Sequence, residues 1–309
     1  MRVKRAVLYE LVALIGLASL TGCSISPMSK RTAAFSTAAV ATTQKTTKAY
    51  QLVEQSYHDS QVAALVDTYD QDGFHPETIQ PFISAEEMKV RTQVLQGLTT
   101  YAETLAEISS DQPLKTLDTQ AAAFGKSLQT ISRNGEIKPL AKSAHISDTE
   151  LNIVTTAVDA LGRALIENRR RKDLPQVLRQ MKEPVNQICE LLEKDIGDPE
   201  KSGLRNELKN NYQKLVRKQE QFIQHNERQM SPQEKRQEIQ RLPQLVSEAK
   251  SADESLAATQ KALAQLAKTH AALVESGDAK DSPAFRTLLA ELIGSGQQLA
   301  EFYQKLPAK

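Results

Sequence analysis

Residues 84–109, SAEEMKVRTQVLQGLTTYAETLAEIS, carry the pattern on which the fold prediction depends. The stretch opens with Ser84 and has Glu87 three residues later, which is the spacing of a capping box at the start of a helix. Apolar side chains then recur three and four residues apart, at Val94, Leu98, Tyr101, Leu105 and Ile108. This period puts them on one face of an α-helix that must be buried against a neighbour.

The same signals return along the rest of the chain. Capping-box spacing recurs at Ser147 with Glu150 and at Ser231 with Glu234, and Pro232 stands where a first helical residue is expected, as does the proline at 283. Apolar stripes of helical period cover residues 117–131, 151–165, 178–192, 256–273 and 289–303. No segment keeps a two-residue alternation for long, so we predict an all-α fold, an antiparallel helical bundle.

The bundle domain is predicted to cover residues 34–309. Its first helix is expected from about Ala34 to about Tyr69, with an uncertain beginning because threonines interrupt the alanines. Residues 70–83 contain one glycine and two prolines and are predicted to be a loop. Apolar side chains of that loop, Phe74, Ile79 and Phe82, are expected to pack it over one end of the bundle.

Residues 206–241 are the least apolar part of the chain and have only a thin seam of apolar side chains. Such a seam is typical of two coiled-coil-like helices that touch only each other. We predict a helical hairpin that projects from the bundle, with arms at about 199–229 and 232–275 and its tip near Met230 and Ser231. Pro243 should kink the second arm or begin a new helix. The hairpin is either an arm that contacts a partner or a solvated helix pair.

The first residues have the three parts of an export signal. A short basic stretch at residues 1–5 precedes a run at 6–19 that is apolar apart from Tyr9, Glu10 and Ser19. Leu20, Thr21, Gly22 and Cys23 follow directly, and these four residues resemble the lipobox of bacterial lipoproteins. The run is too short for a transmembrane anchor, and a cysteine stands where an ordinary secreted protein has a small residue. Glu10 departs from the pattern and should weaken membrane insertion.

The lipoprotein resemblance implies a location and a modification. Residues 1–22 would be removed as a signal peptide between Gly22 and Cys23, and Cys23 would carry lipid chains such as palmitate. Residues 23–33 would be a flexible, lipid-anchored tether. The residue after the lipidated cysteine is Ser24 rather than an aspartate, which implies sorting to the outer membrane in a host that has one, with the body on its periplasmic or surface face.

Charge and cysteine content restrict the function further. Residues 1–22 hold three of the 39 basic and one of the 38 acidic side chains, so 36 and 37 remain and the net charge is near −1. Nothing in this balance calls for nucleic acid as a partner. Cys189 is then the second and last cysteine, beside Ile188 and Leu191. A small buried hydrophobe is the expected role for it, and a catalytic thiol is the alternative.

The remaining conspicuous residues do not assemble into a catalytic or metal-binding motif. Glu54 with His58 lacks further metal ligands, and His270 falls in the seam of the second hairpin arm. The basic run at 169–172 could bind an anionic lipid or a cell-wall acid, or simply follow the helix dipole. Gly294 and Gly296 are interpreted as close-packing positions. No catalytic residue, cofactor or metal is predicted, and no small-molecule substrate is inferred.

Two function classes fit these observations. The first is a non-catalytic envelope lipoprotein, a scaffold or adaptor that binds an envelope protein or the cell wall through the hairpin or a bundle face. The alternative is a membrane-acting protein like a helical pore-forming toxin. Such proteins usually hide a long apolar hairpin, and no run after residue 22 is long enough to cross a bilayer, so the scaffold is favoured. An enzyme ranks third.

Overall fold

The computed structural model describes residues 26–66, 79–110, 117–137, 147–167, 174–277 and 281–305, together with Gly73, His75 and Ala279. Within these residues the chain forms eight helices and no strand, which confirms the all-α prediction. They are α2 (Pro27–Val66), α4 (Ala85–Ser109), α5 (Leu117–Arg133), α7 (Asp148–Glu167), α8 (Leu174–Ile196), α9 (Leu204–Asn226), α10 (Pro232–Ser276) and α11 (Pro283–Lys305). The signal peptide, Gly22, Cys23 and the basic run at 169–172 lie outside the described residues.

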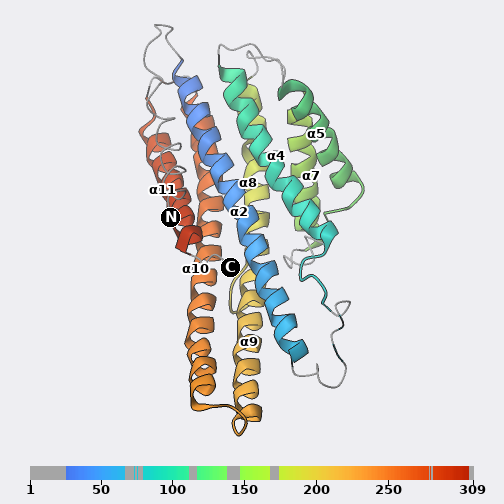
Figure 1. The fold of residues 1–309 in the computed structure, drawn as a ribbon. Coiled ribbons are helices and arrows are strands. Elements are labelled where there is room, and N and C mark those ends of the chain that lie inside the picture. Colours follow the sequence, from blue (N-terminus) through green and yellow to red (C-terminus); the bar gives the residue numbers. More distant parts are fainter. Residues whose placement is uncertain are drawn as a thin grey trace.

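The helices lie side by side along one long direction (Figure 1). α2 packs on α4, α5 packs on α7, and α10 packs on α8, α9 and α11. The stripe predicted in α4 is buried, and it joins a core to which all eight helices contribute. None of these helices is both long enough and apolar enough to cross a membrane.

The predicted helix starts are observed. Ser84 and Glu87 form a reciprocal capping box before α4, and Ser231 and Glu234 form another before α10. At α7 the Glu150 carboxylate accepts a hydrogen bond from the Ser147 amide, and the Glu150 amide donates to the Ser147 hydroxyl. These caps satisfy backbone N–H groups that a helix leaves without partners at its amino end.

The first helix begins earlier than predicted. α2 starts at Pro27, so residues 27–33 of the predicted tether are helical and belong to the bundle. Met28, Thr32 and Phe35 are buried on one face. Thr32 is tolerated there because its hydroxyl donates to the Met28 carbonyl at 3.0 Å, so that burial leaves no polar group without a partner.

The predicted hairpin is observed as α9 and α10, with its tip between Asn226 and Pro232. Two details differ from the prediction. The first arm begins at Leu204, not at residue 199. α2 packs against α9, so the two arms do not touch only each other. Of the two alternatives predicted for Pro243, a new helix start is not observed, because α10 runs through this residue as one helix.

A tight turn at residues 197–203 delays the start of α9. Gly197 has φ 75°, and a Cβ on it would lie 2.0 Å from the carbonyl oxygen of Ser202. The Asp198 amide donates to that same Ser202 oxygen at 2.8 Å. The Gln260 side chain of α10 donates to the carbonyl of Gly197 at 2.8 Å. This turn is therefore held against α10 and fixes how the first arm leaves the bundle.

Candidate functional site

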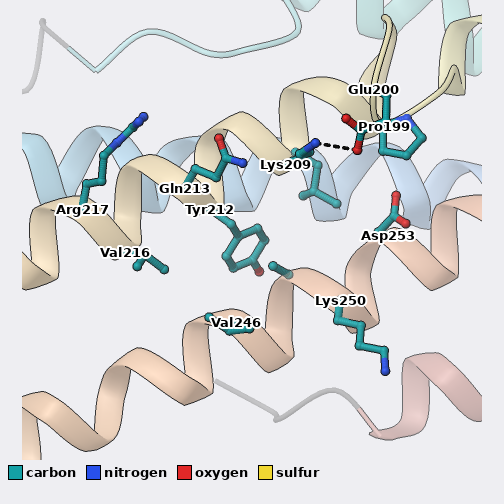
Figure 2. A pocket seen from close by; sticks show the side chains of 12 residues that line it. Pro199, Glu200, Lys209, Tyr212, Gln213, Val216, Arg217, Val246, Lys250 and Asp253 are labelled. Carbon is teal, nitrogen blue, oxygen red and sulfur yellow. Dashed lines mark hydrogen bonds and ion pairs between the residues drawn. The ribbon is translucent and has the colours of Figure 1, made fainter.

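A groove of about 550 Å³ lies between α9 and α10 (Figure 2). Each residue that lines it comes from one of these two helices or from the turn before α9. Its apolar lining consists of Leu208, Tyr212, Val216, Val246 and Ala249 together with Pro199. The volume lies within the range of sites that bind ligands or partner side chains.

The groove is open because the second arm is short of large side chains at this height. Ala249 is small, and Val246 leaves 59% of its surface exposed although it lines the groove. Ile239, seven residues before Val246, is 45% exposed. Residues seven apart lie on nearly the same face of a helix, so the two side chains form one exposed apolar stripe along α10.

The charges around the groove leave a positive surplus. Both acidic side chains of the lining are engaged: Glu200 is 2.6 Å from Lys209, and Asp253 accepts two hydrogen bonds from Arg205 at 2.7 and 2.9 Å.

Arg217, on the α9 side, has no ion pair with any residue that the structure describes. Lys250, on the α10 side, has a loose ion pair with Glu254 at 3.9 Å and no other among the described residues. α9 as a whole has five basic and two acidic side chains, a net charge of +3. The groove therefore has an apolar floor, with the cation Arg217 on its α9 side and the cation Lys250 on its α10 side.

Tyr212 reaches from α9 toward α10 within the groove (Figure 2). Burial raises the pKa of its hydroxyl to about 12, and the negative charges of Glu248 and Asp59 add to that shift. The hydroxyl therefore stays protonated at neutral pH and can donate a hydrogen bond.

A second polar cluster is closed off inside the bundle. The Arg91 guanidinium donates to both carboxylate oxygens of Asp195 at 2.9 and 2.8 Å, and the two side chains are 1% and 0% exposed. The Tyr50 ring lies 5.6 Å from the guanidinium, and burial, followed by the charge of Asp195, raises the pKa of its hydroxyl. A salt bridge without access to solvent has a structural role in this fold.

The pair of Arg91 and Asp195 was not predicted from the sequence, although one signal for it was present. Arg91 stands three residues before Val94 and Asp195 three residues after Leu192, so each charge falls in the apolar register of its own helix. A charge in such a register indicates a buried partner, but the register does not identify the partner.

His270 and Cys189 are both fully buried. The Tyr101 hydroxyl and the His270 Nε2 atom are hydrogen-bonded at 3.0 Å, and burial lowers the pKa of His270 to about 3, so the ring is neutral. Burial also raises the pKa of the Cys189 thiol, which keeps it protonated and unreactive. Cys189 is thus the small buried hydrophobe that its neighbours predicted.

Glu54 binds backbone amides and has a structural role. Its carboxylate accepts hydrogen bonds from the backbone amides of Phe82 and Ile83 at 3.1 and 2.9 Å, while His58 lies 3.7 Å from Asp59. Within the described parts of the chain, no three His, Cys, Asp or Glu side chains are grouped to hold a metal. The packing predicted for Phe82 is confirmed, and that of Phe74 falls outside the described residues.

The close-packing role predicted for Gly294 and Gly296 is wrong. A Cβ on either glycine would meet no atom within 4 Å, because that side of α11 faces open space. Helices approach closely at Gly162 instead, where a Cβ would lie 2.7 Å from the Gly125 carbonyl oxygen. This contact joins α5 to α7.

Comparisons with known proteins found no counterpart: no family model, no curated protein and no solved structure matches this chain.

Proposed function

We propose that this protein is a lipid-anchored scaffold of the bacterial cell envelope, in which Cys23 holds the chain at a membrane and the α9–α10 hairpin binds a partner. The similarity of residues 20–23 to a lipobox supports the anchor. The position of the hairpin relative to the beginning of α2 supports the binding role and is the observation that carries the proposal.

The amino end of α2 and the hairpin tip lie at opposite ends of the molecule (Figure 1). The Arg31 guanidinium donates to the Ala279 carbonyl at 2.5 Å, which places the beginning of α2 beside the end of α10. α10 has 45 residues, and at 1.5 Å per residue its far end, the hairpin tip, is about 68 Å away.

The lipid attachment point would be close to the same end as Pro27. Cys23 precedes Pro27 by four residues, which span at most about 15 Å. A lipid on Cys23 would therefore hold the α2 end near the bilayer, and the hairpin would extend away from it. An anchor at one end and an open apolar groove toward the other is the arrangement expected of an adaptor.

Labelling with a palmitate analogue tests the anchor, with each cysteine replaced in turn. The native chain and the Cys189→Ser control should incorporate the label, and the Cys23→Ser variant should not. The label is the primary readout, because an uncleaved signal peptide could itself hold the variant in a membrane. Equal labelling of Cys23→Ser and the native chain would overturn the anchor.

Crosslinking in cells tests the arm. A photoreactive residue at exposed Gln229, near the tip, should capture a discrete partner, whereas the same residue at Ile153, which is exposed on α7, serves as the matched control. Identical products from both positions would contradict a specific role for the hairpin.

A further inference from the structure

We infer that the groove between α9 and α10 is the docking site of an amphipathic helix with acidic side chains flanking its apolar stripe, supplied by another envelope protein. This inference rests on the proposed scaffold role and names the class of partner that the hairpin would bind.

The shape of the exposed surface fits a helix. The apolar stripe runs from Ile239 to Val246, and the groove continues along α10 to Asp253, seven residues after Val246. Fourteen residues of α10 span about 21 Å. A third helix of about four turns has the same length, and a furrow between two packed helices is where the ridge of a third helix fits.

The charges select an acidic partner. Among the charged side chains that line the groove, Glu200 and Asp253 are already bonded to Lys209 and Arg205. Arg217, and Lys250 with its 3.9 Å pair to Glu254, are therefore the lining charges that a partner can meet. Arg217 on α9 and Lys250 on α10 extend outward from opposite edges of the groove (Figure 2). Carboxylates on the two edges of a docked helix would therefore each meet a cation. A basic helix would be repelled.

A second copy of this chain is a poorer occupant for the same reason. Symmetric association through this face would place Arg217 and Lys250 of both copies in one interface. Like charges brought together at an interface oppose association.

The test uses the full chain in lipid nanodiscs and three labelled 18-residue helical peptides. All have the same spacing: one has a leucine stripe with Glu flanks, one the same stripe with Lys flanks, and one the Glu flanks with Gln in the stripe. Fluorescence anisotropy should show the first peptide binding at least about tenfold more tightly than the other two.

Variants then locate the site. Val246→Gln should weaken the Glu-flanked peptide about tenfold, because it removes exposed apolar surface where the stripe of α10 enters the groove. The double variant Arg217→Glu/Lys250→Glu should reverse the preference in favour of the Lys-flanked peptide. Its matched control is Arg228→Glu/Arg236→Glu, which makes the same charge change at exposed positions outside the groove and should preserve the preference.

Several outcomes would overturn the docking site. Equal affinity for the Glu- and Lys-flanked peptides would do so, as would unchanged binding by Val246→Gln. Self-association in sedimentation that Val246→Gln abolishes would assign the groove to a second copy. Binding of a fluorescent fatty acid without binding of any peptide would assign it to a small amphiphile. Palmitate labelling of Cys23 is independent of all these results, so the anchor and the groove fail separately.

Discussion

At the scale of single residues, the buried pair of Arg91 and Asp195 has the largest consequence for stability. Each charge would be costly to bury alone, because a dry interior cannot replace its hydration. Together they satisfy one another through two hydrogen bonds that join α4 to α8. The pair therefore specifies how these two helices are aligned.

Replacing one of the two charged residues should lower the free energy of unfolding far more than replacing both. We expect Asp195→Leu to lower the free energy of unfolding by about 3 to 5 kcal/mol, because it leaves the Arg91 guanidinium buried without a counter-charge. The double variant Arg91→Met/Asp195→Leu should recover most of that loss. Urea titrations of Arg91→Met, Asp195→Leu and the double variant complete the cycle. Additive losses would mean that the two charges do not depend on each other.

How far single residues could be predicted depended on whether their role was local. The buried stripe of α4 and the buried position of Cys189 follow from their neighbours in the sequence. The partner of Arg91 is 104 residues away, and the partner of His270, Tyr101, is 169 residues away. Periodicity gives each helix a face but does not determine which faces meet.

At the scale of helices and turns, starts were easier to predict than the connections before them. Serine caps mark the beginnings of α4, α7 and α10, because the capping side chains are adjacent in sequence to the amides they satisfy. α9 has no side-chain cap and follows Gly203, so its start could not be located from the sequence in the same way. α2 was predicted too short because its threonines are satisfied within the helix itself.

The turn before α9 should tolerate no side chain at Gly197. We expect Gly197→Ala to lower the free energy of unfolding by about 3 kcal/mol, because the left-handed φ and the overlap of the new Cβ with the Ser202 carbonyl both oppose the native turn. Gly294→Ala is the matched control: its Cβ meets nothing, and the better helix propensity of alanine should stabilise α11 by up to about 1 kcal/mol. Thermal unfolding measures both. A Gly197→Ala variant as stable as the native chain would show that the turn can rearrange.

At the scale of the whole molecule, the bundle and its hairpin were predictable, and the groove was not. The apolar stripes and the polar arms follow from patterns within single segments of the sequence. The groove depends instead on how Ala249 and Val246 of one arm line up with Tyr212 of the other. The packing of α2 on α9 was also missed, because it depends on pairing between distant helices.

Global stability should depend on pH through Glu193. Burial, and then the charge of Glu190, raise its pKa from 4.5 to about 7, against an opposing effect of Lys268. Between these values the folded chain binds more protons than the unfolded chain, so this group makes stability fall as pH rises from about 4.5 to 7 and has no further effect above 7. Partial exposure limits the effect to about 1 kcal/mol.

Glu193→Gln should remove that decline, and Glu86→Gln, at an exposed position of α4, should retain it. Urea midpoints measured at intervals from pH 4.5 to 8 would reveal the difference. If the native and Glu193→Gln curves run parallel over this range, the carboxyl does not titrate there.

The position of Pro243 inside α10 also determines where a mechanical force would bend the hairpin. The ring removes one bond from the backbone ladder eleven residues from the start of the helix, about 16 Å along its axis. Bending of α10 requires the least energy at that point, which lies between Val246 and the hairpin tip. A force on the hairpin tip should therefore bend α10 at Pro243, about three turns from the tip. The part of α10 that follows Pro243 should keep its shape.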